Sequence, residues 1–252
     1  MENKFIVVVP HYNAEQWVLK SLKSLKLQEY TNYECIVMDD ASTDNSTALI
    51  KKFIKDEEKF TLVENKNNIG PLGNAYSAVM NHTSHANSDD VIVILDGDDF
   101  LYSKRTLNIL NDCYNNNDCW MTYGSYINLS DKKRGKFSQP IPEYVIDNNL
   151  YRQFKWTTSH LRTYKKFLVE NVDVKDLKDE NGLFFKAAGD LAMMFPMLEM
   201  SREKACYIHD ILYIWNDLNS LNEHKTKRNE QLNCEQLVRN GRKYDKLVRD
   251  TK

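Results

Sequence analysis

The sequence of 252 residues lacks several features that would place it in a specialised class of protein. It contains no apolar run of the roughly 18–20 residues that a membrane-spanning helix needs. Its net charge of −2 gives no reason to expect nucleic acid or an anionic membrane as a partner. The N-terminus runs directly into a short strand-like segment and lacks the cleavage site of a secretion signal. These absences predict a cytoplasmic protein with no transmembrane segment and no nucleic-acid partner.

Cysteine is sparse, and its spacing has no recognisable signature. The five cysteines are an odd number scattered along the chain, and no CxxC pair occurs. Without a secretion signal, such a set is typical of reduced thiols in a cytosolic compartment. We therefore expect reduced thiols rather than a disulfide framework.

Strand-like and helix-like segments alternate regularly in the first half of the chain. The apolar runs that predict strands lie at 5–9, 34–38, 60–63, 91–95 and 120–123. The alternation predicts an α/β fold with a doubly wound, mostly parallel central sheet flanked by helices. The second half is less regular, with a helix expected at 188–200 and a strand at 205–215.

Polar residues follow the predicted strands at their carboxyl ends, where doubly wound sheets bind ligands. Asp96-Gly97-Asp98-Asp99 places three carboxylates in four residues directly after the run at 91–95. Such close like charges need a counter-charge, and hard oxygen ligands suit Mn²⁺ or Mg²⁺. Gly97 would leave room for a ligand to approach. The alternative is an Asp/Gly-rich turn whose carboxylates are simply solvated.

Two further polar segments follow the second and third predicted strands. The carboxylates of Asp39-Asp40-Ala41-Ser42-Thr43-Asp44 can accept hydrogen bonds from a base or a ribose hydroxyl, or the segment can simply cap the helix near Ser46. The segment 65–70 leads into a helix that begins near Pro71, and helix N-termini favour phosphate. Each of these signals is weak when taken alone.

Four motifs occur in one order at fitting intervals along the chain. They are Val7-Val8-Val9-Pro10-His11-Tyr12-Asn13, Asp39-Asp40-Ala41-Ser42-Thr43-Asp44, Asn68-Ile69-Gly70 and Asp96-Gly97-Asp98-Asp99. Together they resemble the inverting family 2 glycosyltransferases of the GT-A fold, closely over 1–125 and loosely over 185–225. The resemblance implies metal-dependent transfer of a hexose from a UDP-sugar to a glycan or protein hydroxyl, with Mn²⁺ or Mg²⁺ on the diphosphate.

The resemblance also implies a domain organisation and a donor pocket. One GT-A domain is expected over 1–225, with a nucleotide-sugar half at 1–125 and an acceptor half at 126–225. A charged helix or tail is expected over 226–252. Pro10 and Tyr12 would line the nucleobase pocket, and Asp39 would bind uracil. Asn68 and Gly70 would shape the nucleoside pocket.

The metal ligands follow from the same resemblance. Asp98 would bind the metal directly, and Asp96 would contact the ribose or the metal's water shell. Asp99 is left open. GT-A enzymes often supply a late histidine as a further ligand, which would be His224, with His209 as the alternative and a solvated surface histidine as the plainer reading of His224.

The family's catalytic base is an acidic residue at the start of a helix beyond the donor half. Asp190 matches it, with an ordinary helix-capping aspartate as the alternative. Many members place Glu before this position, where this chain has Gly189. His11 stands where the family often has Thr or Ser, and its role is open. The segment 151–170 is expected either on the acceptor side or in the core, and it resembles members from large DNA viruses and bacteria, some of which glycosylate collagen-like hydroxylysine.

Two other functions stay open at the level of sequence. A nucleotidyltransferase also uses paired aspartates and Mg²⁺, but it usually carries a Gly-rich basic loop near the first strand, and residues 9–13 contain no glycine. A non-catalytic module that binds sugar nucleotides or glycans is disfavoured by the presence of both Asp98 and Asp190. The transferred sugar and the oligomeric state, including a homodimer, are not specified by any residue.

Overall fold

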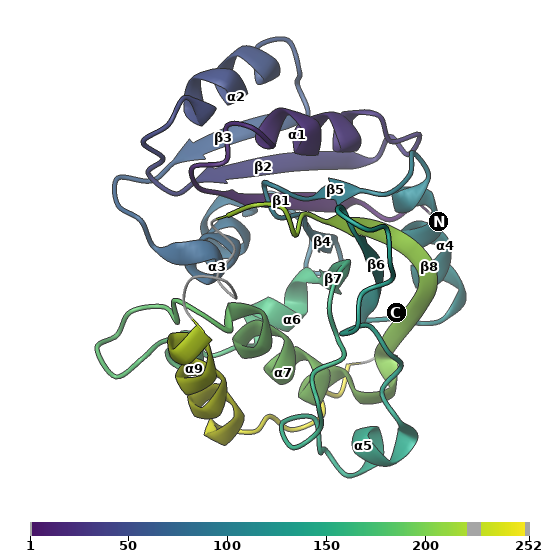
Figure 1. Ribbon diagram of the computed structural model, residues 1–252. Coiled ribbons are helices and arrows are strands. Elements are labelled where there is room, and N and C mark those ends of the chain that lie inside the picture. Colours follow the sequence, from purple (N-terminus) through teal and green to yellow (C-terminus); the bar gives the residue numbers. More distant parts are fainter. Residues whose placement is uncertain (1, 221–227, 250–252) are drawn as a thin grey trace.

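The computed structural model describes residues 2–220 and 228–249, which build one mixed sheet with helices on both faces (Figure 1). The strands are β1 (Phe5–His11), β2 (Tyr33–Asp39), β3 (Phe60–Glu64), β4 (Val91–Ile94), β5 (Phe100–Leu101), β6 (Met121–Asn128), β7 (Arg162–Lys165) and β8 (Ala205–Trp215). Their order across the sheet is β3-β2-β1-β4-β7-β6-β8-β5. The predicted α/β fold is therefore confirmed.

The α-helices of the described residues fill the connections between strands and continue after β8. They are α1 (Val18–Lys26), α2 (Ser46–Ile54), α3 (Gly70–His82), α4 (Thr106–Asn116), α5 (Glu143–Asp147), α6 (Lys166–Glu170), α7 (Gly189–Ser201) and α9 (Arg228–Asn240). Two short 3₁₀ helices lie at Val174–Leu177 and Arg202–Lys204. The expected helix at 188–200 corresponds to α7, and the expected strand at 205–215 to β8.

The four strands β3, β2, β1 and β4 pair in parallel and form the first half of the sheet. Alternate residues of β1 point to opposite faces, as the period of a strand requires. Phe5, Val7 and Val9 pack against α1, α2 and α4, whereas Ile6 and Val8 pack against α3 and α7. Figure 1 shows α1 and α2 on one side of the sheet and α3, α6 and α7 on the other. Burial on both faces explains why these strands are continuous apolar runs.

The second half of the sheet is mixed in direction. β7 is antiparallel to both β4 and β6, β6 is parallel to β8, and β5 is antiparallel to β8. The pairing of β6 with β8 shifts register around Ser125. This half lies where strand periodicity was weakest in the sequence, because its strands are short, bent or polar.

The order of the strands places a switch point between β1 and β4. The chain runs outward from β1 through β2 to β3 and then returns to β4 on the other side of β1. In open α/β sheets, ligands bind beyond the carboxyl ends of the strands at such a point. Gly97, just after β4, donates its amide to the Pro10 carbonyl at 2.9 Å, so the acidic cluster lies beside the end of β1.

The C-terminal residues that the structure describes are anchored to α7 and to the loop before β7. Arg152 and Glu199 form a buried ion pair, with Nε 2.6 Å from Oε1. The Tyr244 amide donates to Glu199 Oε2 at 2.9 Å, and Arg239 donates to the Phe154 carbonyl at 2.8 Å. The charged segment expected at 226–252 is therefore, in its described part, a helix followed by a segment without regular secondary structure (241–249), both held by buried polar contacts.

Cys119 and Cys206 form a disulfide, with their Cα atoms 6.1 Å apart. The expectation of reduced thiols throughout is wrong for this pair. The two residues are separated by 87 positions, and only the pairing of β6 with β8 brings them together. Cys35, Cys113 and Cys234 are free thiols.

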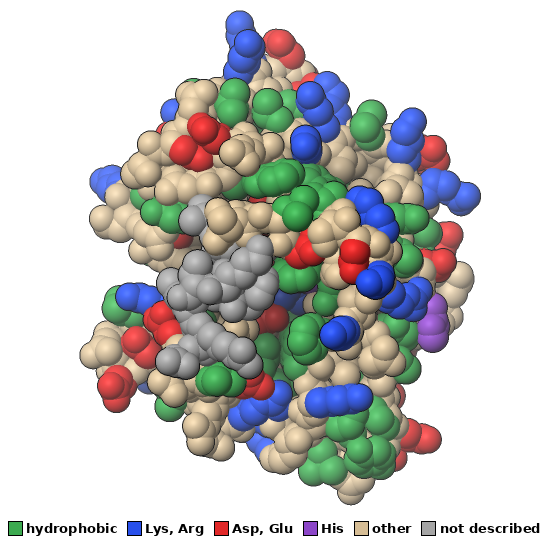
Figure 2. All heavy atoms as spheres, viewed as in Figure 1, with side chains coloured by type: hydrophobic (Ala, Val, Ile, Leu, Met, Phe, Trp, Pro, Cys, Tyr) green, Lys and Arg blue, Asp and Glu red, His purple; other side chains and the backbone are tan. Residues whose placement is uncertain are grey.

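The surface and the helices of the described residues fit the sequence composition. Lys and Arg side chains are interspersed with Asp and Glu over the face seen in Figure 2, in keeping with the small net charge. None of the described helices is long and apolar enough to span a membrane.

Candidate active site

The end of β1 presents one exposed aromatic ring beside the switch point. Pro10 and His11 are buried, whereas Tyr12 leaves 46% of its surface exposed. An exposed ring at the edge of a sheet is available to stack on a planar ligand. The geometry therefore leaves Tyr12 free for the nucleobase role that the sequence predicts.

Asp39 lies at the end of β2 and holds its own loop. Its carboxylate accepts hydrogen bonds from the Ser42 amide at 3.3 Å and the Thr47 hydroxyl at 2.8 Å. Asn13 ties the same loop to β1, because its Oδ1 accepts the Thr43 amide at 2.7 Å. Both readings of this segment, loop organisation and base recognition, use the same carboxylate.

Asp40 was not singled out as a site residue, yet it organises the start of α3. Its carboxylate accepts the amides of Ile69 and Gly70, each at 2.8 Å, and its carbonyl accepts Asn68 Nδ2 at 3.2 Å. Gly70 has a φ of +78°, a left-handed conformation that favours glycine. The Asn68-Ile69-Gly70 turn is thus shaped by a buried carboxylate as well as by its own sequence.

The three carboxylates after β4 have different surroundings. Asp99 is buried and accepts the Tyr213 hydroxyl at 2.7 Å and the Asn216 amide at 2.6 Å. Asp98 accepts Asn219 Nδ2 at 2.6 Å. Asp99, whose role was left open, therefore fixes the end of β8 against the acidic cluster.

Burial makes these carboxylates costly to ionise together. Loss of solvent raises the pKa of Asp98 to about 6; the hydrogen bond from Asn219 opposes this rise, and the nearby charge of Asp96 adds to it. Burial also raises the pKa of Asp99 well above its usual value, and the charges of Asp98 and Asp96 raise it further. Among the described residues, no Lys or Arg forms an ion pair with Asp98 or Asp99. A bound cation would relieve this repulsion.

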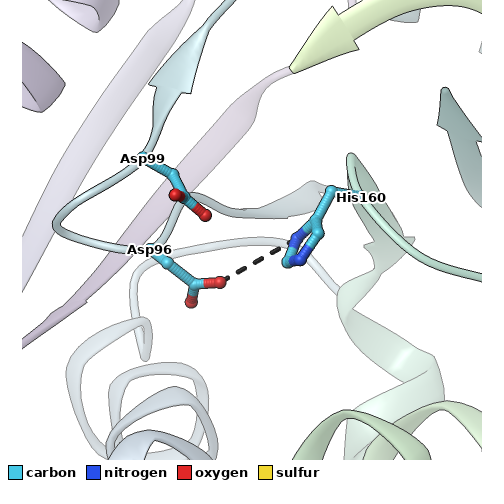
Figure 3. Close-up of side chains that lie close together, drawn as sticks. All are labelled: Asp96, Asp99 and His160. Carbon is cyan, nitrogen blue, oxygen red and sulfur yellow. Dashed lines mark ion pairs between the residues drawn. The ribbon is translucent and has the colours of Figure 1, made fainter. Parts of the chain in front are cut away.

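His160 joins the acidic cluster from the loop before β7 (Figure 3). Its Nδ1 lies 3.9 Å from Asp96 Oδ2, and one ligand atom from each of Asp96, Asp99 and His160 lies within 4.8 Å of the others. The imidazole stacks on Tyr213 at a centroid distance of 4.5 Å. Burial lowers its pKa well below the usual value, and the charge of Arg162 lowers it further; both effects favour the neutral ring. Nδ1 has no hydrogen-bond partner.

Arg162 connects the acidic cluster to α7. Its Nη2 lies 3.4 Å from Asp96 Oδ2, and its Nη1 lies 3.4 Å from Asp190 Oδ2. The Asp190 side chain is one-third exposed, at 33%. Burial raises the pKa of Asp190, while Arg162 opposes that rise. The predicted base and the predicted donor carboxylate thus share one guanidinium.

The start of α7 explains why glycine precedes Asp190. A Cβ on Gly189 would lie 2.8 Å from the Cβ of Leu72, so α7 and α3 touch at this position. Ala188 before it adopts a φ of +54°. A glutamate, which many family members carry here, would require the two helices to separate.

Gly97 is required by β1. A Cβ at this position would lie 2.9 Å from His11 Nδ1 and 3.0 Å from the Pro10 carbonyl oxygen. The space that was expected to admit a ligand is therefore filled by the neighbouring strand. Both ring nitrogens of His11 are buried without a hydrogen-bond partner.

The remaining predicted residues fall in several places. His224 lies outside the described residues. His209 is exposed, and its ring packs edge-on against Tyr207 at 4.7 Å. In the segment 151–170, Trp156 packs against Phe195 and Leu161 is buried, so much of this segment belongs to the core.

Sequence reasoning singled out neither Arg162 nor Tyr213 as a residue of the acidic site. Arg162 lies opposite Ile94 in the antiparallel pairing of β7 with β4, and Tyr213 lies 114 residues from Asp99. The sequence carries one local signal for them, the mix of aromatic and basic residues over 156–164. Only the strand order places these side chains beside the carboxylates.

Comparison with known proteins gives a family and a fold. The family described as "Glycosyl transferase family 2" matches residues 6–173. A GalNAc(5)-diNAcBac-PP-undecaprenol beta-1,3-glucosyltransferase of Campylobacter jejuni is 27% identical over 218 residues, which are 84% of this chain and 64% of that protein. The putative glycosyltransferase EpsE of Bacillus subtilis is 35% identical over 40% of this chain and 35% of its own.

Solved structures share the fold. S. aureus TarS 1-349 in complex with UDP-GlcNAc has a TM-score of 0.66 at 21% identity, covering 89% of this chain and 61% of that one. The mannosyltransferase PcManGT from Pyrobaculum calidifontis, in complex with GDP-Man and Mn²⁺, has a TM-score of 0.62 at 18% identity, covering 96% and 66%. This chain spans less than two thirds of the length of the Campylobacter relative and of TarS.

Proposed function

Because the chain belongs to glycosyl transferase family 2, we propose that it transfers a hexose from a UDP-sugar to an acceptor hydroxyl, with inversion at the anomeric carbon. One observation carries this proposal. Asp96 and Asp190, the donor carboxylate and the base that the motifs predict, lie on two sides of the same guanidinium of Arg162. The family assignment favours this function over a nucleotidyltransferase.

The donor would lie beyond the carboxyl ends of β1, β2 and β4. Tyr12 and Pro10 would contact the base, Asp39 would accept a hydrogen bond from uracil, and Asp96 would contact the ribose. Asn68 and Gly70 would shape the nucleoside pocket from the start of α3. The TarS structure with UDP-GlcNAc supports a uridine donor, whereas PcManGT holds GDP-Man, so both bases belong in the test.

The residues after β4 fit a divalent cation. Their carboxylate oxygens are ligands that Mn²⁺ and Mg²⁺ prefer. Burial first, and the neighbouring carboxylates second, raise the pKa of Asp98 and of Asp99, and a bound cation would offset both effects. Asp98 would be the direct ligand, and His224 is a predicted second ligand. When bound, the cation stabilises the charge of the leaving diphosphate.

Asp190 would act as the general base. The acceptor oxygen forms a bond to the anomeric carbon while the bond from that carbon to the diphosphate oxygen breaks, with its electron pair leaving on the diphosphate. The acceptor proton passes to a carboxylate oxygen of Asp190. A raised pKa brings a carboxylate closer to the strength of a useful base, and its exposed third gives the acceptor access.

The experiment is a donor panel of UDP-sugars and GDP-sugars assayed for nucleoside diphosphate release with Mn²⁺, with Mg²⁺ and with a chelator. We expect release of UDP from at least one UDP-sugar, dependent on the cation. Release from GDP-sugars alone would overturn the uridine assignment. Tight binding of a UDP-sugar without release, even with a panel of glycan and peptide hydroxyl acceptors, would favour the non-catalytic binding module.

A further inference from the structure

Arg162 lies in the sheet next to the acidic cluster. It begins β7 and lies opposite Ile94, the last residue of β4, so its side chain starts beside the acidic cluster. Only 9% of the side chain is exposed. A buried guanidinium is stabilised when carboxylates face it, and here two carboxylates from distant segments do so.

The two contacts use different nitrogens of the guanidinium. Nη2 faces Asp96 in the loop after β4, and Nη1 faces Asp190 on α7, each at 3.4 Å. The planar guanidinium fixes the spacing of its nitrogens. The positions of the two carboxylates therefore depend on one another through Arg162.

Among the described residues, no other positively charged side chain pairs with both carboxylates. Within the described part of the chain, Arg162 is the Lys or Arg that forms ion pairs with these two carboxylates, and the His160 ring lies near Asp96 alone, with Nδ1 3.9 Å from Oδ2. The Tyr213 hydroxyl donates to Asp99 at 2.7 Å and lies farther from Asp96 Oδ2, at 3.5 Å, and it carries no charge to pair with Asp190. Loss of Arg162 would leave Asp190 without its charged partner.

We propose that Arg162 is a positioning residue of the transfer reaction, which holds the Asp190 carboxylate at a fixed position relative to the donor-side carboxylate Asp96. The proposal rests on the function proposed above. Arg162 does not take the acceptor proton. It keeps the receiving oxygen of Asp190 at a fixed place relative to the sugar donor, where an error of about 1 Å can cost a factor of about 100 in rate.

The substitution Arg162→Gln removes the positive charge and the planar set of N–H groups that faces Asp96 and Asp190. We expect kcat to fall by about 100-fold, with the KM for the acceptor changed by less than about threefold, because the geometry of the base is lost rather than ground-state binding. Arg162→Lys keeps the positive charge but lacks the planar set of N–H groups, and it should have about a tenth of the wild-type kcat. An unchanged kcat in Arg162→Gln would overturn the proposal.

A second comparison separates positioning from general damage to the fold. In an Asp190→Asn background, Arg162→Gln should lower the residual rate by less than about threefold, because residues that act as a unit are not additive. An equal 100-fold loss in both backgrounds would overturn the proposal. Thermal unfolding of each variant reports whether it folds. If Arg162→Gln does not fold, Arg162→Lys replaces it in both comparisons.

Arg152→Gln is the matched control. Arg152 is also a buried arginine in a carboxylate pair, but its partner is Glu199 near the other end of α7. We expect this variant to lose stability and to keep the kcat of its folded fraction. The donor panel with the wild-type protein separates failure of the proposed function from failure of the positioning role. Absence of any transfer contradicts the proposed function. Transfer that is insensitive to Arg162 contradicts only the positioning role.

Discussion

The loops that follow β2 and β3 and the surface built from β4, β7 and α7 hold their carboxylates in different ways. Asp39 and Asp40 accept hydrogen bonds from the amides and hydroxyls of their own loops or of the next helix. Asp96 and Asp190 instead depend on Arg162, which comes from another strand. The first region is organised by hydrogen bonds within and between neighbouring loops, and the second by charge pairs between distant segments.

This contrast predicts different effects of substitution. Removing a carboxylate in the loops removes backbone hydrogen bonds, so the expected loss is in the free energy of unfolding. Removing one on the second surface removes a charge that is already costly to bury, so the expected loss is in activity.

Asp190→Asn should have the largest effect. It is nearly isosteric and keeps the start of α7 in place, but an amide cannot take the acceptor proton. We expect the transfer rate to fall by about 10²–10⁴-fold, the range in which general bases contribute, while UDP binding stays within about threefold of wild type. Single-turnover assays with radiolabelled donor would measure the rate. Wild-type turnover in this variant would place the base elsewhere.

Asp40→Asn tests the locally organised region. One oxygen that accepts a backbone amide becomes a donor, so a part-buried N–H at the start of α3 loses its charged partner. We expect a loss of about 3 kcal/mol in the free energy of unfolding, measured by urea titration. The exposed residue Asp56 provides a control, since Asp56→Asn should change stability by less than about 0.5 kcal/mol. Equal stabilities for the two variants would contradict the capping role of Asp40.

The pH dependence of stability tests the acidic cluster. The pKa of Asp98 is about 6 in the folded protein and about 3.9 when unfolded, so the folded state binds more protons between these values. In metal-free buffer, this group's contribution is fully present below pH 4 and is lost as the pH rises through 6, a loss of roughly 2 to 3 kcal/mol. Asp98→Asn should lack this fall. Identical pH profiles of stability for the two proteins would show that folding does not raise the pKa of Asp98.

Gly97→Ala tests the contact between the acidic cluster and β1. The added methyl would overlap His11 and the Pro10 carbonyl, so we expect a loss of about 2 kcal/mol in stability. Shortening the neighbour in a Gly97→Ala/His11→Ser double variant should recover part of this loss. Thermal melts of the three proteins would measure it. No recovery would mean that His11 is not what excludes a side chain at position 97.

The same contrast explains what the sequence could predict. Strands β1, β2 and β4 were predictable because they are buried on both faces, and the polar residues after them mark the ligand-binding edge. Family motifs supplied Asp39, Asn68 and Asp98 for the same reason, since each lies within a short local segment. The roles of these residues in binding stay predictions.

Residues that meet across the sheet could not be predicted. Arg162 meets Asp96 over 66 positions, Tyr213 meets Asp99 over 114, and the disulfide joins Cys119 to Cys206 over 87. Each contact depends on the order in which β7, β6 and β8 join the sheet, and local periodicity carries no information about that order. The tertiary structure alone assigns Asp99 to the anchoring of β8.

The most direct measurement is calorimetry of UDP binding with and without Mn²⁺ for the wild type, Asp98→Ala and Asp190→Asn. The account predicts Mn²⁺-dependent binding for the wild type and for Asp190→Asn, and loss of that binding for Asp98→Ala, because Asp98 is assigned to the metal and Asp190 is not. Unchanged Mn²⁺-dependent binding in Asp98→Ala would contradict the assignment of the residues after β4 to the diphosphate end of the donor site.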